Sequence, residues 1–84
     1  MSFHDTAELH AMAARNHFEW ATRDENEFKV GRFTEAAKFR REAVEAEKKA
    51  FEAENAGNGE LAWKEGENGR VAAYKAAQAE DMRR

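Results

Sequence analysis

Residues 30–36 read VGRFTEA and lie between two long segments that are rich in alanine. Glycine commonly ends a helix, because it adopts the left-handed backbone conformation needed there without steric cost. Only Gly31, Arg32 and Phe33 separate the two helical patterns, and so short a connection joins helices that run antiparallel. The stretch therefore predicts an antiparallel helical hairpin, with Gly31 capping the first helix.

The segments on either side of this turn carry helical stripes of small and aromatic residues. The stripe in residues 5–31 alternates steps of four and three, at Ala7, Ala11, Ala14, Phe18, Ala21, Glu25 and Phe28. The stripe in residues 34–55 alternates steps of three and four, at Ala36, Phe39, Ala43, Ala46, Ala50 and Ala53. Such steps place residues on one face of an amphipathic helix. We expect these stripes, Phe18 and Phe39 included, to form the core, and Asp5 to cap the first helix.

A third helical segment follows a break at residues 56–59, which read AGNG. This segment contains Gly66 and Gly69, and each glycine costs about 1 kcal/mol relative to alanine inside a helix. We therefore expect a third helix that is kinked or interrupted near the two glycines. The sequence predicts an all-α fold in which the helical hairpin and this third helix form a small three-helix bundle, with residues 1–84 as a single domain.

The composition predicts a thin core. Of the 84 residues, 18 are alanine and only 17 are larger apolar residues. A core this small is marginal for an independent fold. We therefore expect a homo-oligomer, or a protein partner that completes the core.

Charge and composition also exclude several classes of protein. The chain has no cysteine, so disulfides and thiolate metal sites are excluded. Its net charge is −3 and its basic residues are not clustered, whereas nucleic-acid binding needs a basic patch. No apolar run approaches the roughly 20 residues of a membrane span, and the N-terminus lacks the pattern of a signal peptide. We expect a cytoplasmic protein that binds neither nucleic acid nor membranes.

The hairpin resembles a tetratricopeptide-type helix pair over about 30 residues. With Gly31 at the turn glycine of that motif, Trp20 and Phe33 fall on aromatic positions of the motif. Ala36 and Ala43 then fall on positions where small residues let the two helices touch. The pattern departs at residues 23–24, 40 and 48, where the motif usually has Leu-Gly, an aromatic residue and proline. The resemblance implies binding of a peptide or protein in a helical groove.

The residues that most often carry chemistry are not arranged for it in the sequence. His10, His17 and Asp24 recur every seven residues, which places them about 10 Å apart along a helix, too far apart for one metal ion. The carboxylate pairs Glu45/Glu47 and Glu52/Glu54 are two residues apart, so they point in different directions and are expected on solvated faces. The sequence also has no phosphate-binding loop, and no serine or threonine is positioned to act as a nucleophile with a histidine. We expect no enzyme activity, no cofactor and no metal site within one chain.

Aromatic residues are the best candidates for a binding surface, because a small core cannot bury them all. Trp20, Trp63 and Tyr74 are of the types that anchor protein interfaces. The alternative for the two tryptophans is a place in the core, under the third helix or at the end of the bundle. Arg40 and Arg41 are further candidates, for an acidic partner or a phosphate, unless neighbouring glutamates simply balance them on an exposed face.

Three functions follow from these patterns. The first, which we favour, is a non-enzymatic protein–protein interaction module, such as a small accessory or phage-type factor acting as an inhibitor or adaptor of a host protein. The second is a self-assembling structural subunit built from alanine-rich helices. The third is an oligomeric metal-binding bundle, in which His10 and His17 come from several subunits.

Overall fold

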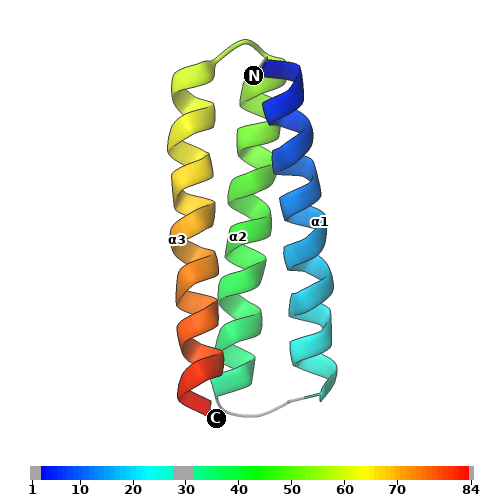
Figure 1. Cartoon of the computed structure of the whole chain (residues 1–84), viewed down its shortest axis with the longest axis vertical. Coiled ribbons are helices and arrows are strands. Elements are labelled where there is room, and N and C mark those ends of the chain that lie inside the picture. The colour runs from blue at the N-terminus through cyan, green and yellow to red at the C-terminus, as the bar shows by residue number, and fades with distance from the viewer. Residues whose placement is uncertain (1–2, 28–31, 84) are drawn as a thin grey trace.

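The computed structural model consists of three helices that run down, up and down in the view of Figure 1. Their bounds are Phe3–Glu27 for α1, Arg32–Asn55 for α2 and Gly59–Arg83 for α3. They form a rod with extents of 40 × 18 × 17 Å, in which α2 packs along both other helices while α1 and α3 barely touch. The predicted all-α three-helix bundle is confirmed. No helix in the described part of the chain is long and apolar enough to cross a membrane.

The helix bounds agree with the sequence in part. The structure describes the backbone of residues 3–27 and 32–83 and the side chains of residues 5–26 and 35–81. The predicted cap at Gly31 lies outside the described residues, as do the side chains of Phe28 and Phe33. The predicted start at Asp5 is wrong, because α1 begins at Phe3 and already includes Asp5 in its first turn.

The predicted break between the second and third helices is confirmed by a well-formed turn. Gly57 has a φ of 81°. Its N–H donates to the Glu54 carbonyl at 3.0 Å, and the Asn58 N–H donates to the Ala53 carbonyl at 2.8 Å. This pair of bonds is the Schellman motif, which satisfies the last carbonyls of α2. Asn58 then caps α3, because its Oδ1 accepts the Leu61 N–H at 3.2 Å.

The apolar part of the core is almost entirely alanine in the described residues. Among the described residues, the buried apolar side chains are Ala7, Ala14, Ala21, Ala36, Ala37, Ala43, Val44, Ala46, Ala50, Ala53, Ala62, Ala72, Ala76 and Ala79. Of the large apolar side chains that the structure describes, most are instead exposed, namely Leu9, Met12, Phe18, Trp20, Leu61, Trp63, Val71 and Tyr74. Small side chains let the helix backbones approach closely, so little space remains between them for a ring.

Phe18 corrects the predicted core. It belongs to the α1 stripe, yet 53% of its surface is exposed. Ala14 and Ala21, one turn to either side of Phe18, form the close contact between the helices. The Phe18 ring therefore lies at the edge of that contact. Phe39 of the α2 stripe is partly exposed, and the Lys75 ammonium lies 5.9 Å from the centre of its ring.

Helix α3 runs unbroken through its two glycines, which corrects the predicted interruption. A Cβ on Gly66 would meet His10 Cε1 at 2.9 Å, and a Cβ on Gly69 would meet Glu47 Oε1 at 2.6 Å and the Glu47 Cγ and Cδ atoms at 3.1 Å. The glycines are therefore contact positions. They leave room for two polar side chains from the neighbouring helices.

We expect Gly69→Ala to lower the free energy of unfolding by about 1 kcal/mol, because the added methyl overpacks against Glu47. On helix propensity alone, the same change would raise it by about 1 kcal/mol. Urea denaturation of a double-mutant cycle with Glu47→Ala tests the contact. In the Glu47→Ala background, Gly69→Ala should become stabilising. A stabilising effect in both backgrounds would contradict this account.

Candidate functional site

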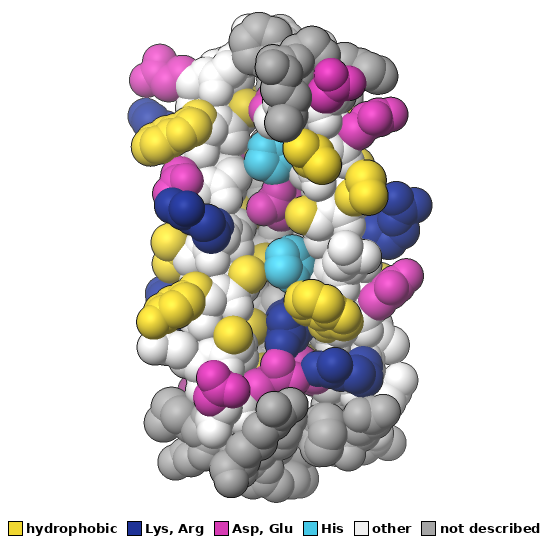
Figure 2. Space-filling model, in the orientation of Figure 1, with side chains coloured by type: hydrophobic (Ala, Val, Ile, Leu, Met, Phe, Trp, Pro, Cys, Tyr) yellow, Lys and Arg dark blue, Asp and Glu magenta, His cyan; other side chains and the backbone are white. Residues whose placement is uncertain are grey.

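A line of polar and charged side chains fills the furrow between α1 and α3. Figure 2 shows histidine, acidic and basic side chains following one another down this furrow. We call this line the charged seam. It comprises His10, His17 and Asp24 of α1, Arg40, Glu47 and Glu54 of α2, and Glu80 of α3. Helix α2 forms the floor, and four of these side chains are buried, namely Asp24, Arg40, Glu47 and Glu54.

In the lower half of the seam, Arg23 of α1 joins Asp24, Arg40 and Glu80 in a closed network of two arginines and two carboxylates. Arg40 Nε donates to Asp24 Oδ2 at 2.9 Å, and a terminal nitrogen of Arg40 donates to Glu80 Oε2. Arg23 donates to Asp24 Oδ1 and to Glu80 Oε1, both at 2.6 Å. Two negative and two positive charges balance, and the network joins all three helices.

Asp24 has no exposed surface, although it carries a charge. Burial by itself raises the pKa of this carboxyl, but the hydrogen bonds from Arg23 and Arg40 outweigh it and hold the pKa below its ordinary value. The ionised form is therefore the one that fits the fold. Removing one partner would leave a buried charge without compensation, which is strongly destabilising.

Arg40 and Trp20, two of the residues predicted as binding candidates, lie together. The Arg40 guanidinium carbon is 4.9 Å from the centre of the Trp20 ring, so the ring covers the ion pair from solvent. Arg40 is only 5% exposed, which corrects the expectation of an exposed face. Trp20 is 46% exposed. Arg41 is exposed and pairs with Glu25 of α1 at 2.8 Å.

The upper half of the seam holds one histidine between two glutamates. His10 Nδ1 hydrogen-bonds Glu47 Oε2, and His10 Nε2 lies 3.6 Å from Glu54 Oε1. Glu47 and Glu54 are 7% and 8% exposed, which corrects the prediction that both lie on solvated faces. Among the described side chains, Glu54 Oε2 is buried and has no hydrogen-bond partner.

His17 sits between the two halves of the seam. Its ring packs edge-on against Trp20, with ring centres 5.9 Å apart, and its buried Nδ1 has no partner among the described residues. Burial lowers the pKa of His17; the charge of Glu47 opposes this shift and the charge of Arg40 adds to it. The neutral ring is therefore favoured in the folded protein.

A pocket of about 280 Å³ opens at the upper end of the seam. We call it the Glu54 pocket, and its lining is Thr6, His10, Glu54, Gly59, Ala62, Trp63, Gly66 and Glu67. The unpartnered carboxylate oxygen thus belongs to a side chain that lines this cavity together with Trp63. The described residues contain no group of three or more histidine or acidic side chains able to hold a metal ion.

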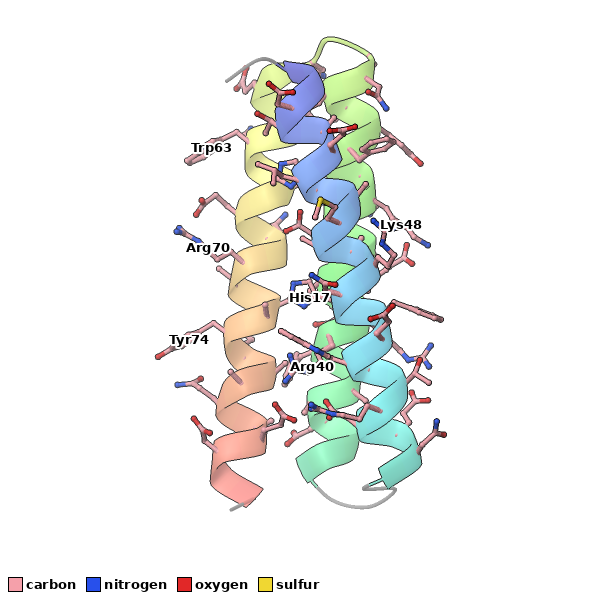
Figure 3. All side chains as sticks on the ribbon, turned by 45° about the vertical axis from the view of Figure 1, so that its right-hand side comes forward. His17, Arg40, Lys48, Trp63, Arg70 and Tyr74 are labelled. Atoms are coloured by element: carbon pink, nitrogen blue, oxygen red, sulfur yellow. The ribbon has the colours of Figure 1, made fainter. Side chains whose placement is uncertain are left out.

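The outer side of α3 carries the most exposed aromatic residues. Trp63, Arg70 and Tyr74 project from the same side of this helix, away from the other two (Figure 3). Trp63 is 68% exposed and Tyr74 is 65% exposed. We call these three residues the α3 face. The structure brings together the predicted candidates Trp63 and Tyr74, and it adds Arg70, which the sequence analysis did not select.

An apolar groove of about 400 Å³ runs between α1 and α2 on another side of the bundle. Its lining is Ala11, Ala14, Arg15, Phe18, Val44, Lys48, Phe51 and Glu52. Figure 3 shows that Lys48 points away from the seam. The groove is therefore separate from the charged seam and from the α3 face.

Sequence reasoning missed the seam, although a signal for it was present. Arg40, Glu47 and Glu54 are seven residues apart, like the seam residues of α1, and two such series predict facing stripes when their helices pair. The glycines of α3 were the second signal, because they mark positions of close approach.

Comparisons with known proteins give no match. No protein-family model, curated protein or solved structure matches this chain.

We expect Arg40→Ala to lower the free energy of unfolding by about 3 kcal/mol or more, because it leaves buried carboxylates short of a partner. The matched control is Arg41→Ala, one residue along. Its ion pair with Glu25 is half exposed, so its loss should cost about 1 kcal/mol or less. Urea denaturation at neutral pH measures both. Equal losses in the two variants would contradict a buried, coupled network.

We expect the stability of the protein to fall as the pH drops below 6.5, the ordinary pKa of a histidine, partly because of His17. The unfolded chain takes up the proton first, since burial depresses the pKa of His17 in the folded state. His17→Gln should therefore flatten the decline measured by urea denaturation across a pH series. The control Asn16→Gln, at an exposed neighbouring position, should keep the slope of the natural chain. An unchanged slope in His17→Gln would contradict the assignment.

Proposed function

We propose that this protein is a non-enzymatic protein-interaction module and that the α3 face is its contact surface. The observation that carries the proposal is the exposure of Trp63 and Tyr74, about two-thirds each, on one side of an unbroken helix. Tryptophan, tyrosine and arginine are the residues that most often dominate the energy of protein interfaces. The α3 face presents one of each.

The rigidity of α3 supports this role. The aromatic rings stand on a regular helix of 25 residues that packs along α2 through alanines. A partner that binds a preformed surface avoids the entropic cost of ordering a loop. Arg70 pairs with Glu67 at 2.6 Å on the same face, so the surface carries both charges beside its aromatic anchors. The fitting partner is a protein with an apolar groove whose rim is polar.

Self-assembly is the second candidate, and the α1–α2 groove favours it. The groove is apolar, and the half-exposed ring of Phe18 stands in it. Its rim carries Arg15, Lys48 and Glu52, so charges of both signs are available to a second copy of the same surface. A symmetric contact of this kind would cover Phe18 and leave the α3 face free.

Trp63→Ala and Tyr74→Ala should each lose at least about tenfold in partner binding, because each removes an interface anchor. The natural chain and both variants are immobilised and exposed to lysate of the source cells, and retained proteins are quantified by mass spectrometry. Helicity by circular dichroism should not change, since both side chains are mostly exposed.

Phe18→Ala is the matched control, because it removes a half-exposed ring from the other surface. It should retain the partner. A partner lost with Phe18→Ala but kept by Trp63→Ala would contradict the α3 face. The mass of the free protein is measured over a dilution series, and a concentration-dependent mass that only Phe18→Ala abolishes would establish self-assembly through the groove.

A further inference from the structure

We infer that the Glu54 pocket binds a primary ammonium group, either of a free amine or of a lysine side chain. The inference deepens the proposed function. It rests on that function for one point, namely that a partner protein supplies the lysine. Trp63 links the two sites, because it lines the pocket and also belongs to the α3 face.

The first argument is the state of the Glu54 carboxylate. Its side chain is more than nine-tenths buried, and its Oε2 has no partner among the described residues. Its Oε1 lies 3.6 Å from His10 Nε2, which is too long for a hydrogen bond. Burying an ionised carboxylate without a partner is costly. A buried polar atom without a partner requires an explanation, and a bound ion or ligand that completes the site is one.

The second argument is the charge balance along the seam. The lower half is neutral, because the two arginines match Asp24 and Glu80. The upper half sets Glu47 and Glu54 against His10 alone, and His10 Nδ1 is already bonded to Glu47. Even a protonated histidine would leave one negative charge there without compensation. The missing charge is a single cation.

The third argument is the shape and lining of the pocket. It has about 280 Å³ of space, and Trp63 is one of its lining residues. Glu67 also lines the pocket, although Arg70 already pairs with it at 2.6 Å. A single free carboxylate oxygen suits a compact ammonium better than the two-pronged guanidinium of arginine.

Titrations followed by NMR test the inference without any partner protein. The probes are cadaverine as a free amine, Nα-acetyl-lysine methylamide as a lysine side chain, and Nα-acetyl-norleucine methylamide as a neutral control. The chain has two tryptophans, so Trp20→Phe assigns their indole N–H signals. We expect the Trp63 signal to shift saturably with an amine probe and not with the norleucine compound.

Glu54→Gln should weaken amine binding about tenfold, because it removes the charged acceptor. Glu52→Gln, the same change of charge at an exposed position two residues earlier, should leave binding unchanged. Glu54→Gln should also unfold at the same temperature as the natural chain or at a higher one, since it removes a buried charge whose Oε2 has no hydrogen-bond partner. Trp63→Ala should weaken binding as well, and it should not unfold the protein because Trp63 is mostly exposed. This variant lacks the Trp63 indole signal, so the Gly66 amide signal reports its binding.

The inference is overturned if neither amine produces a saturable shift, or if Glu54→Gln binds as tightly as Glu52→Gln. Binding of cadaverine alone supports the site with a free amine as its ligand. Binding of the capped lysine supports a side chain as its ligand. The partner-capture experiment stays separate, because Trp63→Ala and Tyr74→Ala would lose a partner even if no amine bound. If an amine binds but no partner is captured, the proposed function is contradicted and the ammonium site is still supported.

Discussion

Arg40 pairs with Asp24 of α1 and with Glu80 of α3 from its place on α2. The two outer helices barely touch, so each depends on α2 for its place, and this arginine fixes the register of both. A buried ion pair adds little stability over apolar packing of the same volume, but it penalises any arrangement that separates its members. In a bundle whose alanine contacts are nearly interchangeable, such a penalty selects one alignment of the helices.

The alanine core and the exposed aromatic residues have one common cause. Helices that meet through alanine approach too closely to hold rings between them, so Phe18, Trp63 and Tyr74 remain outside. A small domain that exposes its largest apolar side chains exposes what an interface needs. The α3 face and the α1–α2 groove are therefore consequences of the same packing, and they lie on different sides of the rod.

The glycines of α3 connect the seam to the surface. Gly66 and Gly69 lower the helix propensity of α3. Because they have no side chain, His10 and Glu47 fit beneath the helix without displacing it. The same close approach buries Glu54 beside a pocket that Trp63 lines. The upper seam thus combines a stability cost with an open cavity. This combination distinguishes it from the lower seam, in which every charge is matched and the network is structural.

The sequence by itself determined the three helices, the break at residues 56–59 and the alanine stripes, because these depend on local propensity and on a period of 3.6 residues. It also predicted that Trp63 and Tyr74 exceed what the core can hold. Only the tertiary structure decided that Arg40 and Glu54 are buried, that Phe18 is exposed and that α3 is continuous. The physical reason is that burial of a charge, and tolerance of a glycine, depend on what the neighbouring helix places opposite. That pairing depends on how three helices align in space, which no single stripe specifies.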